Sequence, residues 1–122
     1  MSGEHFEFMT AVNSLDYTKV EMMLKAGLSP NFHWSDAEET PLHDAIDSEI
    51  DWSQPNPRPD GRMIRLLLDY GADPNLVNRK GESPLDWARG RSVTTPIHPK
   101  AYEMLLERGG QHRKPLHSTH PS

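Results

Sequence analysis

The sequence predicts an all-α protein, a solenoid built from about three helix–turn–helix units. Two patterns point to it: an apolar segment followed by glycine occurs three times, and a proline-centred segment occurs twice. Composition agrees, because hydrophobic residues make up only 34% of the 122 residues. Even with the 8 Gly included, this fraction stays below the roughly 45–50% of a typical globular domain. A thin, repetitive core is therefore expected.

The first pattern predicts the outer helix of each unit. Residues 20–31, 64–75 and, more weakly, 102–110 place large apolar residues at i, i+3 and i+4, which is one face of a helix. In the first two copies a proline three residues beyond the helix end prevents continuation. Each copy ends in a glycine, which adopts the left-handed conformation without a Cβ penalty: Gly27, Gly71 and Gly109.

The second pattern predicts the start of an inner helix. Residues 40–45 read Thr-Pro-Leu-His-Asp-Ala, and residues 83–88 read Ser-Pro-Leu-Asp-Trp-Ala. The hydroxyl is expected to cap the free N–H groups of the first turn, where proline also fits because its missing donor costs nothing there. Leucine followed by alanine three residues later puts one large and one small apolar group on the same face.

Together these patterns resemble the ankyrin repeat: Thr-Pro-Leu-His and a helix, then Leu-Leu-x-x-Gly-Ala-Asp-Pro-Asn. The resemblance implies hairpin fingers between the helix pairs and one domain over 1–110, followed by a polar tail over 111–122. The first repeat lacks the Thr-Pro-Leu-His start, as is typical of an end-capping repeat. The implied repeats are about 5–31, 32–75 and 76–110.

The sequence departs from the family in two ways. The glycines are 44 and 38 residues apart, against a family period of about 33. The extra residues lie mainly in a proline-rich loop over 51–61 and in a loop over 90–99. Asp86 stands where the family has histidine. The resemblance implies that Thr40 and His43 hydrogen-bond locally to tie neighbouring repeats, and that Ser83 and Asp86 do so differently.

Support for catalysis is weak. His43 and Asp47 lie four residues apart on a helix, a spacing that suits a general base and its orienting carboxylate. The resemblance gives His43 a structural role instead, and no nucleophile elbow or glycine-rich phosphate loop is present. We therefore predict that the protein is not an enzyme, with a small hydrolase as one alternative.

Metal binding has one candidate. His112, His117 and His120 could hold zinc or nickel if the tail wrapped around the ion. The segment is short, polar and interrupted by proline, which is more typical of a frayed terminus. The absence of cysteine excludes disulfides and thiolate metal sites. The prediction is no metal and no cofactor, and a metal-binding tail is the alternative.

Charge is divided unevenly along the chain. The net charge of −5 resolves into −9 over residues 1–60 and +4 over residues 61–122. In a solenoid these halves become two ends of one molecule, because each repeat contacts only its neighbours. The balance argues against nucleic-acid binding, which needs clustered cations. No apolar run approaches the roughly 18 residues of a membrane span, so we expect a soluble, cytoplasmic protein.

The resemblance places a binding face on the fingers and inner helices, on the concave side. Trp34 has two possible roles there: an exposed anchor for a partner protein, or a side chain that folds back over the finger. Trp52 and the loop over 51–61 offer a second contact surface unless Trp52 anchors that loop. The candidate partner-binding residues are His33, Trp34, Asp36, Glu38, Glu39, Asp47, Ser48, Arg79, Lys80, Glu82 and Arg91.

The predicted function is non-catalytic binding of another protein that presents a basic patch. By analogy of fold and charge, the protein resembles stoichiometric inhibitors, including immunity proteins that neutralise bacterial toxins. A self-associating scaffold is the alternative, since opposite charges at the two ends permit head-to-tail contact. The expected state is a monomer or a weak homo-oligomer.

Overall fold

The computed structural model describes residues 3–53, 60–90 and 96–113, with side chains not described for 51–53. The described residues form helices and loops, with one isolated β-bridge and no β-strand, so the all-α prediction is confirmed. The proline-rich stretch 54–59, the segment 91–95 and the tail 114–122 lie outside the described residues. The helices are α1 (Gly3–Asn13), α2 (Tyr17–Lys25), α3 (Pro41–Ser53), α4 (Arg62–Asp69), α5 (Pro84–Arg89) and α6 (Pro99–Glu107).

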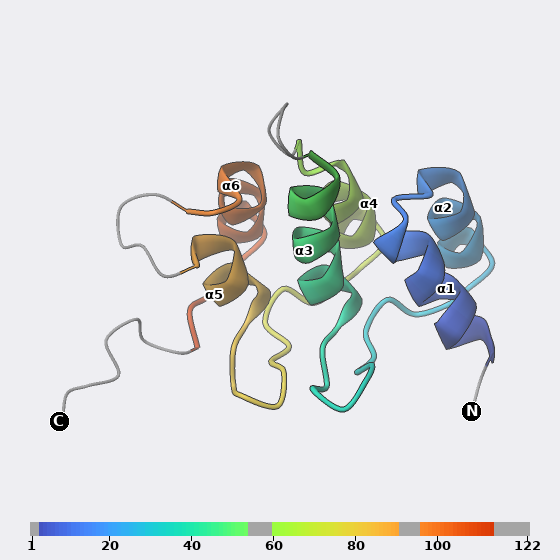
Figure 1. Cartoon of the computed structure of the whole chain (residues 1–122), viewed down its shortest axis with the longest axis horizontal. Helices are drawn as coiled ribbons and strands as arrows, with labels where there is room; N and C mark the ends of the chain where they lie inside the picture. The colour runs from blue at the N-terminus through green and yellow to red at the C-terminus, as the bar shows by residue number, and fades with distance from the viewer. Residues whose placement is uncertain (1–2, 54–59, 91–95, 114–122) are drawn as a thin grey trace, which may run out of the picture.

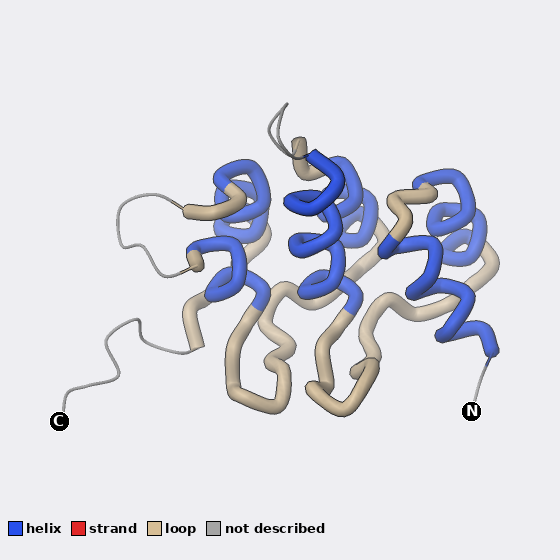
Figure 2. Tube along the Cα trace, viewed as in Figure 1, coloured by secondary structure: helices blue, strands red, loops and turns tan. Residues whose placement is uncertain are grey.

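The helices stack in two rows. Inner helices α1, α3 and α5 stand side by side, with outer helices α2, α4 and α6 in a second row behind them (Figure 1). Each inner helix packs on the next, and the same holds for the outer helices. The loops before α3 and α5 project together from one side of the stack (Figure 2). These loops are the predicted fingers of the second and third repeats, called here the second finger (residues 33–39) and the third finger (residues 78–82).

Helix ends follow the predicted chemistry with one difference. Ser83 and Asp86 form a complete capping box at the start of α5. At α3 the Thr40 hydroxyl instead donates to Nδ1 of His43 over 2.8 Å, and the same nitrogen accepts from the Thr40 amide. The predicted hydroxyl cap is therefore replaced at α3 by the histidine ring. All three helix-ending glycines have positive φ: 106° at Gly27, 96° at Gly71 and 88° at Gly109.

Two asparagines join the ends of successive outer helices by hydrogen bonds. Asn31 donates to the Gly71 carbonyl over 3.0 Å and accepts from the Asp73 amide over 2.6 Å. Asn75 repeats both contacts one unit later, donating to Gly109 and accepting from the Gln111 amide. These bonds fix the spacing of the stack independently of apolar packing.

The core is one layer between the two rows. Of the methionines, Met9 and Met63 are buried in it, whereas Met22 is 64% exposed. Met23 and Met104 are partly buried against the core. The fully buried large side chains include Phe8, Val12, Leu42, Ile46, Ile64, Leu67, Leu85 and Leu105.

Candidate functional site

The second finger is a tight turn. Trp34 and Glu39 exchange backbone hydrogen bonds of 2.6 and 3.0 Å. Ser35 and Glu38 have positive φ, 74° and 57°, which lets the chain reverse within four residues without glycine. The side chains of the turn residues Ser35, Asp36, Ala37 and Glu38 are exposed. The finger therefore presents a carboxylate-bearing tip on a defined backbone.

Hydrogen bonds to Asn78 close the turn of the third finger. The Asn78 amide donates to the Glu82 carbonyl over 3.0 Å, and Oδ1 of Asn78 accepts from the amides of Lys80 and Glu82. Gly81 has a φ of 79°, which suits glycine. The Glu82 carboxylate accepts from Nε1 of Trp87 over 2.8 Å. Arg79 and Lys80 are exposed at the tip.

The two fingers are tied to each other. The Arg79 amide donates to the Ala37 carbonyl over 2.8 Å, and the Arg79 guanidinium lies 3.8 Å from the Glu38 carboxylate. Nearer the helices, Nε2 of His33 donates to the Val77 carbonyl over 3.0 Å. The backbone bond is the stronger constraint, since an exposed ion pair contributes little. The fingers and the adjacent side of α1 and α3 thus form one continuous surface, called here the finger face.

The structure brings most of the predicted binding residues to the finger face. Ser48 is different, because it is buried and its hydroxyl donates to Asn13 over 2.9 Å. Glu39 and Glu82 are half-buried. Arg91 lies outside the described residues. The predicted residues that are exposed are His33, Asp36, Glu38, Asp47, Arg79 and Lys80.

Trp34 folds back onto the core, which is the second of the two roles left open by the sequence, and its role as an anchor for a partner stays a prediction. Its side chain is half-buried against the core, and its ring lies 6.3 Å from the ring of Phe6 on α1. Phe6 itself is 64% exposed. Sequence reasoning missed Phe6, although it lies off the apolar face marked by Phe8 and Val12. Aromatic side chains are enriched at protein interfaces, so the exposed Phe6 beside the half-buried Trp34 is a candidate contact.

Carboxylates gather where α3 meets the second finger. Asp44 on α3 is buried and hydrogen-bonds Glu39 of the finger and Asn13 of α1, with Asp47 close by. Burial, and after it the Glu39 carboxylate, raises the pKa of Asp44 to about 8. Asp44 therefore holds a proton near neutral pH and donates it toward Glu39.

Replacing Asp44 with asparagine tests this proton. The folded pKa of about 8 exceeds the ordinary 3.8, so the folded state binds more protons between these values and stability falls as pH rises through that window. The asparagine side chain would keep the donor without ionising. We expect D44N to be more stable than the wild type by about 1 kcal/mol at pH 8 and equal to it at pH 4, measured by urea unfolding.

The exposed Asp36→Asn is the control for this prediction and should show no such change with pH. An equal effect of D44N at pH 4 and pH 8 would contradict the raised pKa of Asp44.

His43 is held in a structural network. Its Nε2 donates to the Glu82 carbonyl over 2.9 Å, while its Nδ1 accepts from Thr40. Burial lowers the pKa of His43. Its ring also meets Trp87 edge to face, with centroids 4.8 Å apart. Nε2 thereby ties the second repeat to the third, while Nδ1 bonds Thr40 within the second repeat, so neither ring nitrogen is directed to Asp47 as a general base requires.

The third repeat uses Asp86 in place of this histidine. Asp86 accepts from the Ser83 amide over 2.9 Å and from Nδ1 of His112 over 2.7 Å. Nε2 of His112 lies 3.0 Å from the Tyr102 hydroxyl. His112 therefore docks the end of the described chain onto α5 and α6. His117 and His120 lie outside the described residues, and the described part of the chain has no group of three potential metal ligands.

None of the helices in the described ranges is long and apolar enough to cross a membrane.

Comparison with known proteins agrees with this architecture. The model of the ankyrin repeat matches residues 38–79, which span the tip of the second finger, α3, α4 and the start of the third finger. A fowlpox virus protein named for ankyrin repeats is 33% identical over 84 residues, 69% of this chain and 15% of that protein. The human 2-5A-dependent ribonuclease is 34% identical over 74 residues, 61% of this chain and 9% of that enzyme.

This chain spans less than a sixth of the length of either relative. Ankyrin repeats are in general protein–protein interaction modules. The matched segment carries both family motifs, and the structure has the stacked helix pairs and the joined fingers. The chain therefore belongs to the ankyrin-repeat family.

Proposed function

We propose that the protein binds a partner protein through its finger face and that the partner presents a basic patch. The observation that carries this proposal is the exposed Phe6, whose ring lies 6.3 Å from that of Trp34 on the second finger, the loop that also carries the exposed Asp36 and Glu38. An aromatic anchor contributes affinity, whereas surrounding charges mainly speed association and reject wrong partners. The cationic tip of the third finger would orient the partner by meeting an acidic counterpart.

The proposed biological role is stoichiometric inhibition, with toxin neutralisation by an immunity protein as its sharpest form. It is supported by the acidic first half of the chain, −9 over residues 1–60. An acidic face suits a basic active-site cleft such as that of a nuclease. Co-expression with a toxic gene product encoded beside this gene tests the role. Rescue of growth is expected, and its absence would count against neutralisation without affecting binding itself.

A pair of equally exposed side chains tests the finger face directly. Phe6 on inner helix α1 and Met22 on outer helix α2 are both 64% exposed, so neither truncation should disturb the core. With the partner purified from the native cell, we expect Phe6→Ala to weaken binding at least tenfold and Met22→Ala to leave it unchanged, by calorimetry.

Asp36→Lys, at the finger tip, should weaken binding mainly through a slower association rate, and the effect should shrink at high salt. Loss of binding in M22A with none in F6A would place the interface on the outer helices and refute the proposal.

A further inference from the structure

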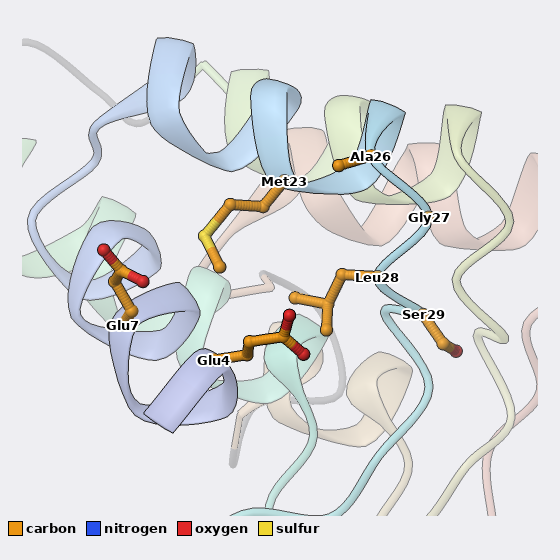
Figure 3. A pocket seen from close by; sticks show the side chains of 7 residues that line it. All are labelled: Glu4, Glu7, Met23, Ala26, Gly27, Leu28 and Ser29. Carbon is orange, nitrogen blue, oxygen red and sulfur yellow. The ribbon is translucent and has the colours of Figure 1, made fainter. Parts of the chain in front are cut away.

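The carboxylates at the pocket between α1 and the end of α2 already have partners. Met23 and Leu28 point into this pocket, and the carboxyl groups of Glu4 and Glu7 lie beside them (Figure 3). Glu7 is paired with Lys19 at 2.9 Å, and Glu4 also has an interaction of its own. A pocket in the groove between outer helices α4 and α6 differs in this respect.

The pocket between α4 and α6 has a volume of about 240 Å³. It lies between two adjacent outer helices rather than at an end of the stack. Its apolar lining is the buried Leu68 and the half-buried Met104. The other lining residues are charged and exposed, and they are Arg65, Asp69, Glu107 and Arg108.

The groove one repeat earlier shows how the equivalent position is closed. There the Tyr70 hydroxyl donates to the Glu21 carboxylate of α2 over 3.1 Å, and Lys25 lies 3.9 Å from the same carboxylate. Counted from the helix-ending glycines, Arg65 is the equivalent of Glu21, and Arg108 is the equivalent of Tyr70. The acceptor and the donor that meet between α2 and α4 are therefore replaced by two donors between α4 and α6.

These two donors leave an acceptor missing from the second groove. Two guanidinium groups cannot bond each other, and Arg108 instead hydrogen-bonds the Asp69 carboxylate. The Arg65 guanidinium has no ion pair or hydrogen bond in the part of the chain that the structure describes. Because arginine has five N–H donors, Arg108 can keep Asp69 and still donate to a second acceptor. A carboxylate from outside the chain would supply what Glu21 supplies one repeat earlier.

The charges of the pocket favour an acidic side chain over a basic one. A cation could meet the Glu107 carboxylate, but it would lie beside two guanidinium groups and leave Arg65 without an acceptor. The half of the chain from residue 61 to 122 also carries a net charge of +4. Arginine binds a carboxylate through two parallel hydrogen bonds. The apolar surface of Leu68 and Met104 suits a side chain with an aliphatic stem, which glutamate has.

We propose that the pocket between α4 and α6 binds a glutamate side chain of a partner protein. Arg65 and Arg108 donate to its carboxylate, and its methylene groups lie on Leu68 and Met104. The pocket belongs to the outer row of helices, whereas the finger face is formed by the fingers and the inner helices. Binding at the pocket and binding at the finger face can therefore be tested, and can fail, separately.

Three small probes with the same backbone test the assignment on the full chain. Acetyl-glutamate methylamide carries the stem and the negative charge, acetyl-glutamine methylamide has the same shape without charge, and acetyl-lysine methylamide reverses the charge. In NMR titrations we expect the glutamate probe to shift the Arg65 Nε–H and Met104 methyl signals saturably, with a Kd of roughly 1–10 mM. The glutamine probe should bind at least about fivefold more weakly, because it lacks the charge that strengthens the hydrogen bonds.

Matched variants locate the charge. Arg65→Gln should raise the Kd of the glutamate probe at least about fivefold, and the rest of the spectrum should stay in place because Arg65 is exposed. Arg62→Gln removes an equal charge from the same helix, but Arg62 lies over the Tyr17 ring outside the pocket lining, so the Kd should stay unchanged. Glu107→Gln removes an opposing charge and should lower the Kd.

Three results would overturn the proposal. They are equal binding of the glutamate and glutamine probes, no saturable shift with either of them, and an unchanged Kd in Arg65→Gln. Saturable binding of the lysine probe that is lost in Glu107→Gln would show instead that the pocket takes a cation.

An acidic side chain of a second copy of this chain is the competing occupant. In that case the Met104 methyl signal would shift with protein concentration alone, and the sedimentation coefficient would rise in parallel. That outcome would also overturn the assignment to a partner protein.

Discussion

Replacing Glu49 with alanine is expected to lower the free energy of unfolding by about 3–5 kcal/mol, because two buried donors lose their acceptor at once. Glu49 lies on α3 and is 3% exposed. Its Oε2 accepts from the Met63 amide over 2.6 Å, and its Oε1 accepts from Nε2 of His98 over 2.5 Å. One carboxylate therefore joins three helices from two repeats.

Each of these bonds supports the N-terminal end of a helix, α4 through Met63 and α6 through His98. Gly61, the residue before α4, has no side chain to cap the helix, so the Glu49 carboxylate takes that role at Met63. His98 caps α6 by accepting from the Ala101 amide at Nδ1. Since Nδ1 accepts, the ring proton is on Nε2 and is donated to Glu49. Alanine would leave both donors buried and open a cavity beside them.

The isosteric Glu49→Gln separates charge from volume. An amide offers one oxygen and one NH2 group to two donors, so one bond becomes a donor–donor contact. We expect a loss of about 2 kcal/mol, between the wild type and alanine. Urea unfolding followed by circular dichroism measures both losses, with Glu103→Ala as an exposed control near zero. A loss under about 1 kcal/mol for Glu49→Ala would show that water replaces the carboxylate.

This network illustrates what the sequence could not predict. The local patterns anticipate the helix-ending glycines, the buried faces of α3 and α4 and the Ser83–Asp86 cap, because each depends on residues within one helical turn. Glu49 meets His98 across 49 positions. A glutamate in an acidic stretch has no local feature that marks it as buried, and the family motif does not include it.

The candidate site likewise has a part that the sequence predicts and a part that it does not. The fingers could be placed from the motif register, and their charged tips follow from composition. The exposure of Phe6 could be predicted, because it lies off the apolar face of α1, but its pairing with Trp34 from another segment could not. Ser48 illustrates the converse: its position on the inner helix suggests an accessible hydroxyl, yet α1 packs over it and Asn13 accepts its hydrogen bond.

Replacing His43 with alanine is the second large effect, an expected loss of about 2–4 kcal/mol at pH 7. The ring is fully buried and contacts Trp87. Alanine removes this packing, frees the Thr40 amide from its acceptor and leaves the Glu82 carbonyl without its donor. The junction between the second and third repeats therefore weakens, and amide exchange in the third finger should accelerate more than exchange in α1.

Asparagine at position 43 distinguishes the two roles of the ring. Its Oδ1 can accept from the Thr40 amide, as Asp86 accepts from Ser83, but its side chain is too short to reach Glu82. We expect His43→Asn to recover about 1 kcal/mol of the alanine loss, the contribution of a helix cap. Equal losses for both variants would mean that the bond between repeats and the packing account for the whole effect.

The pH dependence of the His43→Ala loss provides the decisive check on the protonation state. Burial holds the pKa of His43 below its ordinary 6.5. As pH falls through 6.5 the unfolded chain takes up a proton that the folded ring refuses, so the stability contributed by His43 decreases toward acid pH. Alanine has no proton to bind. The difference in unfolding free energy between wild type and His43→Ala should therefore be smaller at pH 5 than at pH 7. A difference that grows toward pH 5 would require a protonated, ion-paired His43, and with it a donor at Nδ1 where the Thr40 amide needs an acceptor.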